Sequence, residues 1–314
     1  MKILIIGVEK EYNAEFFYKK AFSQLGHEVG SINEYEGIKR PLKTRILHTR
    51  TSVFSFDLYR LQINKNIEKF VKEFEPDIII VFKGELLSKK SLEFLSQNYK
   101  IYLFYPDVYK FKPVLRERLH YFNAVFTAAN KVAPYLDLGA KRVITIPWAC
   151  DPEIHRDLSL QKIFPISFIG TAYWERRKII KQIKFEVSTF GDFWGKLKNW
   201  SYPAVYGDNY IKTINQTLIN LNLQATPSIL GDAPTMRTFE LAGSGGFQIS
   251  DYMPTLKEYF PKLVTFQSID EMNELIAYYI DDVEQAEHIA NSCQSICYKR
   301  FKYTDSSKQI LENL

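Results

Sequence analysis

The chain has 314 residues, of which 46% are apolar and 15% aromatic, a composition that is typical of a folded globular protein and excludes a disordered one. Glycine and proline are modest, at 14 and 13 residues, which excludes collagen-like and low-complexity classes. The formal charge of +5 is mild, and lysine and arginine are spread along the chain, so nucleic acid is not the expected partner. Three cysteines are too few for a disulfide framework, and no histidine stands near them at ligand spacing, so no metal site is expected.

The first apolar run, residues 3–6, is shorter than the roughly 7–15 residues of a signal-peptide core. No stretch approaches the roughly 20 apolar residues that span a bilayer. We therefore expect a cytoplasmic protein without a transmembrane segment, and leave a peripheral membrane contact open.

The first half of the chain alternates apolar strand patterns with helix patterns. Helices are predicted over residues 13–25, 59–74 and 88–98 and again up to Leu138, and the basic stretch 37–56 is expected to be a mobile loop. Strands are predicted at residues 1–7, 29–32, 77–82, 101–105, 124–128 and 142–147. Strands that are apolar throughout and separated by helices are typical of a parallel sheet covered on both faces.

Residues 147–159 break this rhythm and are predicted to be a linker, after which the alternation starts again. Strands are predicted at 164–170, 185–191, 217–223, 245–250 and 263–268, and helices at 174–183, 235–242, 269–281, 283–299 and after Thr304. The fold class is therefore α/β, with two Rossmann-like parallel-sheet domains facing a cleft. The predicted domains are residues 1–149 and 150–300, followed by a helix at 301–314 for which packing back on the first domain is one option.

The strongest local signal is MRTFELAGSGGFQISD at residues 236–251. A helix that starts near Thr235 would direct free backbone N–H groups and the positive end of its dipole at a phosphate. Arg237 could add a charge-assisted bond to the same anion, and Glu240 could accept hydrogen bonds from a ribose diol. The alternative is a capped surface helix with Glu240 solvated. The glycines at 243–246 follow a helix instead of a strand, so a nicotinamide cofactor is not indicated.

Four segments of the second half resemble the CgeB-like branch of the group 1 GT-B glycosyltransferases: DPEIH (151–155), SFIGT (167–171), INLN (219–222) and RTFELAGSGGF (237–247). The resemblance is specific over residues 150–250 and looser over 76–300. The closing His-Thr-Tyr element of that family appears here only as Phe-Lys-Tyr-Thr at 301–304. The resemblance implies a GT-B architecture with an acceptor-side first domain. It also implies a metal-independent glycosyltransferase of the hexosyltransferase type that uses a nucleotide-sugar donor, no cofactor, and a glycan or protein acceptor.

The resemblance also implies roles for individual residues. Related group 1 enzymes carry two acidic residues eight positions apart, of which the second binds the donor ribose and the first approaches the donor sugar. Glu240 matches the second, and Asp232 stands in the place of the first, which slightly favours a retaining reaction. The residues that the resemblance assigns to the donor site are Gly170, Thr171, Arg176, Arg177, Arg237, Thr238 and Glu240. For the two adjacent arginines the alternative is a solvated helix start.

Asp107 follows a predicted strand of the first domain and would be the general base in an inverting enzyme. Its alternative is an Asx-type turn ahead of Pro113. Lys83 and Gly84 stand at another strand end and are expected on the acceptor side. A non-catalytic nucleotide- or glycan-binding protein on the same fold is the second hypothesis, because Asp232 replaces the glutamate of the group 1 pattern.

Overall fold

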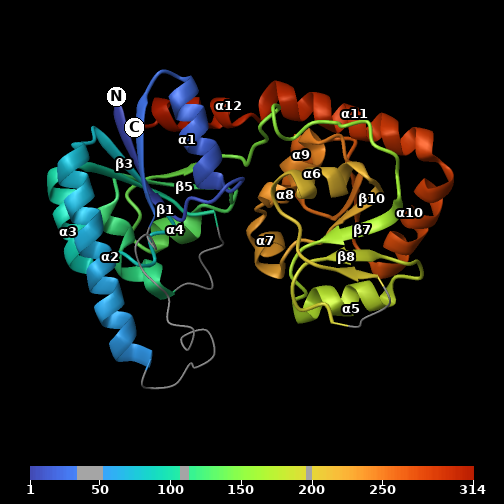
Figure 1. Ribbon diagram of the computed structural model, residues 1–314, viewed down its shortest axis with the longest axis horizontal. Helices are drawn as coiled ribbons and strands as arrows, with labels where there is room; N and C mark the ends of the chain where they lie inside the picture. Colours follow the sequence, from blue (N-terminus) through green and yellow to red (C-terminus); the bar gives the residue numbers. More distant parts are fainter. Residues whose placement is uncertain (34–51, 107–112, 196–199) are drawn as a thin grey trace. The chain divides into compact units, whose positions relative to one another are not determined.

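The computed structural model describes residues 1–33, 52–106, 113–195 and 200–314 (Figure 1). The chain divides into two compact units. Unit 1 consists of residues 1–127, 132–146 and 307–314, and unit 2 of residues 128–131 and 147–306. Each unit contains a six-stranded sheet in which every strand pairing is parallel. The predicted α/β class with two parallel sheets is confirmed.

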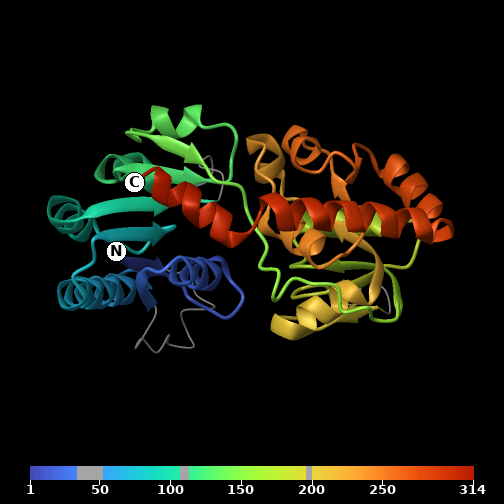
Figure 2. The same cartoon turned by 90° about the horizontal axis from the view of Figure 1, so that it is seen from above.

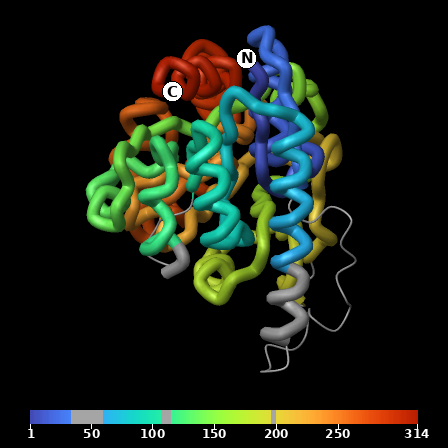
Figure 3. The backbone as a smooth tube through the Cα atoms, turned by 90° about the vertical axis from the view of Figure 1, so that its left-hand side faces the viewer, coloured from blue at the N-terminus to red at the C-terminus, as the bar shows by residue number. Residues whose placement is uncertain are grey.

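In unit 1 the strand order is β2-β1-β3-β4-β5-β6. The strands are β1 (Lys2–Gly7), β2 (Glu28–Asn33), β3 (Ile78–Phe82), β4 (Lys100–Phe104), β5 (Ala124–Thr127) and β6 (Val143–Thr145). The helices are α1 (Ala14–Gln24), α2 (Ser52–Phe74), α3 (Lys89–Asn98) and α4 (Ala133–Asp137), with 3-10 segments at Pro113–Glu117 and Leu119–Tyr121. Helices α2 and α3 contact each other, and Figure 3 views the molecule from the side on which they lie.

The core of unit 1 follows from its apolar strands. All five residues of β3 are buried, as are Ile3–Ile6 of β1, because a central parallel strand is covered on both faces. The rings of Tyr18, Phe82 and Phe104 pack together at centroid distances of 4.9–5.6 Å. Helix α1 is thereby fixed over the carboxyl ends of β3 and β4.

In unit 2 the strand order is β12-β11-β10-β7-β8-β9. The strands are β7 (Phe164–Ile169), β8 (Ser188–Phe190), β9 (Ser201–Tyr202), β10 (Thr217–Asn222), β11 (Gln248–Asp251) and β12 (Val264–Phe266). The helices are α5 (Trp174–Gln182), α6 (Gly207–Asn215), α7 (Thr226–Gly231), α8 (Met236–Gly243), α9 (Pro254–Tyr259), α10 (Ile269–Asp281), α11 (Val283–Arg300) and α12 (Tyr303–Glu312), and the last helix runs from unit 2 into unit 1. Figures 1 and 2 show helices flanking the strands of each unit.

Apolar packing in unit 2 holds α8 in place. Leu241 of α8 belongs to a buried cluster with Ile169, Phe190 and Ile214, the last residues of β7 and β8 and a residue of α6. On its other side Phe239 meets Phe260 and Phe301 at centroid distances of 5.6 and 5.3 Å, and α11 packs along the helix. The start of α8 is therefore held next to the carboxyl ends of β7 and β8.

Several elements differ from those predicted from the sequence. Helices α6, α7 and α9 were not predicted. Of these, α7 and α9 are six residues long, too short for a helical period to show. Strand β8 is three residues long and not the seven expected. Residues 52–56 belong to α2 and not to a loop, whereas the rest of the expected mobile loop, 37–51, lies outside the described residues. Among the described helices, none is both long and apolar enough to cross a membrane.

Candidate functional site

A pocket of about 350 Å³ opens at the carboxyl ends of the strands of unit 2. Strands β8 and β9 extend the sheet to one side of β7, and strands β10, β11 and β12 extend it to the other side. The pocket lies at this switch in direction, where α/β sheets bind ligands. It is lined by Ile169, Gly170, Thr171, Tyr173, Arg176, Phe190, Gly191, Asp192, Ala204, Val205, Tyr206, Asn222, Leu223, Thr235, Met236, Arg237 and Glu240.

Two glycines bring the backbones of β7 and β8 together at the floor of the pocket. Gly191 has φ +148°, and a Cβ there would stand 2.3 Å from the carbonyl oxygen of Gly170. Gly170 has φ +156°, and its Cβ would stand 2.9 Å from Nη1 of Arg237. Trp194 Nε1 donates to the same Gly170 carbonyl at 2.7 Å. Only glycine fits both positions, because a side chain would displace the neighbouring backbone or the guanidinium.

The start of α8 forms one wall of the pocket. Thr235 precedes the helix without a side-chain capping bond, and its own N–H donates to Oε1 of Gln224 at 3.3 Å. The N–H groups of Met236 and Arg237 lie in the first turn, where a helix has no carbonyl to pair with them. This wall therefore presents backbone donors and the positive end of a helix dipole.

Arg237, Tyr210 and Glu240 form a chain of hydrogen bonds beside that wall. Arg237 donates through Nη1 to the carbonyl of Ile169 and through Nε to the Tyr210 hydroxyl at 3.4 Å. Tyr210 in turn donates to Oε2 of Glu240 at 2.8 Å. Burial raises the pKa of Glu240, which is 5% exposed, although Arg237 and Tyr210 oppose the shift. Burial alone would lower the pKa of Arg237, but Tyr210 and Glu240 raise it above its ordinary value, so a cation is fixed at the pocket.

Arg176 places a second guanidinium on the pocket wall. Its Nη1 and Nη2 donate to the carbonyls of Thr171 and Leu223 at 3.3 and 3.1 Å. The side chain lies over the rings of Phe168 and Tyr173, 5.2 and 5.4 Å from their centroids. Nε is buried and has no partner in the described part of the chain. Burial, and then the charge of Arg237, lower the pKa of Arg176 to about 10, so it remains a cation at neutral pH.

Asp251, at the end of β11, is an acidic group whose charge acts on Arg176. Its Oδ2 accepts from the backbone N–H of Gln224 at 2.6 Å. Burial raises its pKa to about 6, against the lowering effects of that hydrogen bond and of Arg176. Asp251 is therefore partly protonated in mildly acidic solution, which changes the net charge beside Arg176.

Two of the predicted donor residues do not line the pocket. Thr238 is fully buried, and its hydroxyl accepts from Asn222 Nδ2 at 2.9 Å and from Gln224 Nε2 at 3.1 Å, within the polar network that joins α8 to β10. Arg177 turns toward the loop after β8, where Nη2 donates to the carbonyls of Phe193 and Trp194. The structure thus brings together five of the seven predicted donor residues: Gly170, Thr171, Arg176, Arg237 and Glu240.

Asp232, the other predicted acidic residue, holds the start of a neighbouring helix. It ends α7 in a left-handed conformation with φ +48°. Its Oδ1 accepts from the N–H of Thr255 at 3.2 Å, and its Oδ2 accepts from the Thr255 hydroxyl at 2.6 Å, in the first turn of α9. Asp232 is not among the residues that line the pocket. A catalytic role for it stays a prediction.

The predicted acceptor-side residues belong to unit 1. Lys83 and Gly84 follow β3 with φ +60° and +64°, and Lys83 is exposed. The carbonyl of Gly84 accepts from Nη1 of Arg118 at 3.3 Å. Asp107 lies outside the described residues, so its role as a general base stays a prediction.

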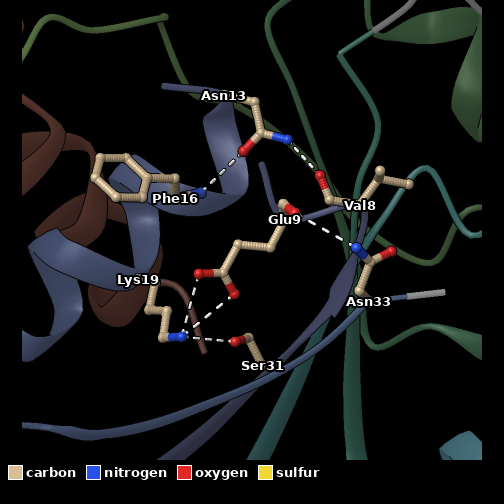
Figure 4. A network of polar contacts seen from close by, with 7 residues as sticks. All are labelled: Val8, Glu9, Asn13, Phe16, Lys19, Ser31 and Asn33. Carbon is tan, nitrogen blue, oxygen red and sulfur yellow. Dashed lines mark hydrogen bonds and ion pairs between the residues drawn. The ribbon is translucent and has the colours of Figure 1, made fainter. Parts of the chain in front are cut away.

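The carboxyl end of β1 in unit 1 carries a polar network (Figure 4). Lys19 Nζ lies 3.2 and 3.3 Å from the two carboxylate oxygens of Glu9 and donates to Ser31 Oγ at 2.8 Å. Asn33 Nδ2 donates to the carbonyl of Glu9 at 3.4 Å. Asn13 donates to the carbonyl of Val8 and caps α1 by accepting from the N–H of Phe16 at 3.1 Å (Figure 4). The network ties together β1, β2 and α1.

Sequence reasoning missed Tyr210 and Tyr206 at the site. Tyr210 lies on α6, a helix that was not predicted, and is brought to Glu240 only by tertiary packing. Tyr206 precedes that helix, lines the pocket and is 75% exposed. The sequence YGDNY at 206–210 contains a glycine and an aspartate ahead of apolar residues, which is the one available signal for a helix start there.

Comparisons with known proteins bear on the fold. A family model described as "Glycosyl transferase-like" matches residues 175–312. Sucrose-phosphate synthase from Thermosynechococcus elongatus superposes with a TM-score of 0.70 at 12% identity, covering 99% of this chain and 98% of that one. The chain has the GT-B glycosyltransferase fold.

Two further structures show the same likeness. Anabaena HepE, solved in complex with UDP-glucose, gives a TM-score of 0.68 at 12% identity, covering 100% of this chain and 99% of that one. The lipopolysaccharide outer core galactosyltransferase WaaB gives a TM-score of 0.61 at 14% identity, with both chains covered in full. No curated protein sequence matches the chain. At these identities the likeness establishes the GT-B fold and leaves the activity to be argued from the site.

Proposed function

We propose that this protein is a glycosyltransferase that moves a sugar from a nucleotide-sugar donor to a glycan or protein acceptor. The observation that carries the proposal is the pocket of unit 2, where the start of α8 and the guanidinium groups of Arg176 and Arg237 meet at the switch point of a parallel sheet. Backbone donors, a helix dipole and two cations together favour a diphosphate. The glycosyl transferase-like match over residues 175–312 supports the same reading.

The diphosphate would lie against Gly170 and the first turn of α8. Gly170 has no side chain, so a ligand phosphate can approach its backbone closely. Arg176 uses only two of its five N–H donors on carbonyls, through Nη1 and Nη2, so further Nη donors remain for the phosphate oxygens. This proposal assigns the phosphates to the most positive part of the pocket.

The nucleoside would occupy the opposite part of the pocket. Oε1 of Glu240 has no hydrogen-bond partner among the described residues, whereas Oε2 is held by Tyr210. That arrangement leaves one carboxylate oxygen to accept from a ribose hydroxyl. Beyond Glu240 the pocket is bounded by residues 204–206 and 191–192, which would surround the base.

Transfer of the sugar leaves a nucleoside diphosphate with more negative charge than the bound donor carried. Arg176, Arg237 and the α8 dipole would stabilise that charge, because preorganised positive groups lower the barrier where charge develops. On this basis we propose a metal-independent hexosyltransferase. The motifs at residues 151–155, 167–171, 219–222 and 237–247 are the reason that we place it in the CgeB-like branch. The reaction is slightly favoured as retaining, and a cytoplasmic location is proposed with it.

Thermal unfolding with UDP, GDP, ADP, CDP and dTDP and their sugars tests the donor site. A ligand at 100 times its dissociation constant adds roughly 2.7 kcal/mol to the free energy of unfolding. We expect one nucleotide to stabilise the wild type and to lose most of this effect in Arg176→Ala and Glu240→Gln. Arg177→Ala is the matched control, since the adjacent arginine bonds to the loop carbonyls and does not line the pocket. Equal stabilisation of Arg176→Ala and Arg177→Ala would contradict the proposed site.

The capture of Asp232 by Thr255 favours a second candidate, a nucleotide- or glycan-binding protein on the same fold without turnover. The two candidates differ in one measurement. A glycosyltransferase slowly hydrolyses its bound donor when the acceptor is absent, whereas a binding protein releases it unchanged. Release of free nucleoside diphosphate by the wild type, and its loss in Arg237→Ala, would exclude the binding protein.

A further inference from the structure

Unit 2 carries an exposed aromatic and basic surface that the proposed donor site does not use. We call it the α5 surface and define it as Trp174, Lys178, Lys181, Lys184 and Phe193. Trp174 is 72% exposed and Phe193 is 78% exposed, whereas Ile166, Phe168 and Ile169 of β7 and Phe190 of β8 are buried. Exposed apolar side chains on this scale mark an interaction surface when they lie together.

Helix α5 has one face that packs inward and one face that is exposed and belongs to the α5 surface. Ile180 is 5% exposed and packs inward. Trp174, Lys178 and Lys181 follow one another at spacings of four and three residues, so their side chains share one helix face. Both lysines are exposed, as is Lys184 just beyond the helix. The outer face of α5 therefore begins with an indole ring and continues with ammonium groups.

The loop after β8 adds Phe193 to the same region. Arg177 of α5 donates to the carbonyls of Phe193 and Trp194, and the N–H of Ala172 donates to the carbonyl of Asp192 at 3.0 Å. Phe193 has φ +64°, an unfavourable conformation for a large side chain. Because the ring is exposed, packing against other side chains does not offset that strain. The backbone thus holds an aromatic ring outward beside the start of α5.

The charge of the α5 surface favours an anionic partner. Lys178, Lys181 and Lys184 have no acidic partner among the described residues, and they outnumber the exposed acids of the same stretch, Glu186 and Asp192. Helices that lie in a membrane interface combine aromatic side chains, which enter the headgroup layer, with lysines, which attract anionic headgroups. Lysine also places its aliphatic stem along the apolar layer while its ammonium stays at the headgroups.

We propose that the α5 surface binds the face of an anionic membrane, with Trp174 and Phe193 entering the headgroup layer and Lys178, Lys181 and Lys184 contacting lipid phosphates. The association is peripheral and reversible, because it has two short apolar contacts and a few charges. It does not depend on the proposed enzymatic activity. It requires the aromatic and the basic side chains together.

Co-sedimentation of the full-length chain with lipid vesicles tests this proposal. We expect binding to vesicles of 70% phosphatidylcholine and 30% phosphatidylglycerol to exceed binding to pure phosphatidylcholine by roughly tenfold, and to weaken as salt rises. Trp174→Ser with Phe193→Ser should lower binding by about tenfold, as should Lys178→Glu with Lys181→Glu. Thermal unfolding of each variant shows that the fold is retained.

Matched controls separate this surface from net charge and from general apolarity. Lys212→Glu with Lys299→Glu changes the net charge equally, on exposed lysines of α6 and α11, and should leave binding unchanged. Tyr278→Ser removes an aromatic residue that is 54% exposed on α10 and should also have no effect. Equal losses in both charge-reversal pairs would reduce the effect to net charge and overturn the proposal. Absent vesicle binding by the wild type would overturn it too. The proposal would also fail if Trp174→Ser with Phe193→Ser still bound vesicles but no longer bound nucleotide, because this surface would then be part of the ligand site.

Discussion

The first strand of unit 1 ends in Gly7 and the first strand of unit 2 is followed directly by Gly170, and the two glycines meet opposite charges. In unit 1 a Cβ on Gly7 would stand 2.9 Å from Cγ of Glu15, whose Oε1 accepts from the N–H of Val8 at 3.2 Å. In unit 2 a Cβ on Gly170 would stand 2.9 Å from Nη1 of Arg237. The carboxyl end of β1 is occupied by the protein's own carboxylate, and the carboxyl end of β7 opens into a pocket lined by guanidinium groups.

This difference teaches that the parallel sheet supplies the position of a ligand site and the side chains supply its chemistry. Glu9 and Lys19 complete the polar network of unit 1, so the ammonium of Lys19 is already engaged with Glu9 and Ser31. In unit 2 the first turn of α8 and part of Arg176 keep unused donors. An anion would meet the carboxylate of Glu15 at the end of β1 and guanidinium groups at the end of β7.

The largest effect is expected from Gly191→Ala, because its Cβ would overlap the Gly170 carbonyl and its φ is +148°. We expect a loss of about 4 kcal/mol in the free energy of unfolding and the loss of the pocket. Gly139→Ala is the matched control in unit 1, since Gly139 also has positive φ but nothing lies within 4 Å of its Cβ, and about 1 kcal/mol is expected there. Thermal unfolding compares the two. Similar losses would show that backbone strain, and not the contact between β7 and β8, decides the cost.

Arg237→Ala should lower the affinity for the nucleotide by roughly 10–100-fold, because hydrogen bonds to charged groups contribute about 1.5–3 kcal/mol. Lys19→Ala breaks the corresponding network of unit 1 and should leave that affinity unchanged. Titration calorimetry measures both, and Arg237→Lys tests whether charge without the guanidinium is enough. Equal losses of affinity in Arg237→Ala and Lys19→Ala would contradict the distinction between the carboxyl ends of β1 and β7.

The pH dependence of stability should differ between wild type and Asp251→Asn. The folded protein raises the pKa of Asp251 from 3.8 to about 6, so the folded state binds the proton more tightly than the unfolded state does. The contribution of this group to stability is therefore greatest at low pH and falls as pH rises from about 4 to 6. Between pH 4 and pH 7 the loss in wild type amounts to about 2 kcal/mol. Chemical denaturation at both values checks this, and identical pH profiles for the two proteins would contradict it.

The smallest effect is expected from Glu15→Gln in unit 1. Burial raises the pKa of Glu15, and a glutamine amide oxygen can still accept from the N–H of Val8. We expect a change of less than about 1 kcal/mol in the free energy of unfolding at pH 7, and unaltered nucleotide binding. Glu240→Gln in unit 2 is the comparison, since the same substitution there should weaken binding. A loss of nucleotide affinity in Glu15→Gln would show that unit 1 takes part in donor binding.

Regular patterns in the chain were enough for most of the fold. The apolar strands at 1–7, 77–82 and 164–170 predicted parallel sheets, because a central strand buried on both faces must be apolar throughout. The stretch 236–251 likewise predicted a helix start and a carboxylate at a ligand site, and the structure places both at the pocket of unit 2. Helices α7 and α9 escaped prediction because six residues carry too few apolar positions to define a period.

The sequence by itself determined the two α/β halves and the identity of the pocket residues near α8, since both follow from local periodicity and spacing. Tertiary structure decided which neighbours share a site. It turned Arg176 into the pocket and the adjacent Arg177 toward Phe193, and it bound Asp232 to Thr255. It also brought Tyr210, thirty residues away, to Glu240. Side-chain direction and contacts between distant segments depend on packing across the whole unit, which no local pattern records.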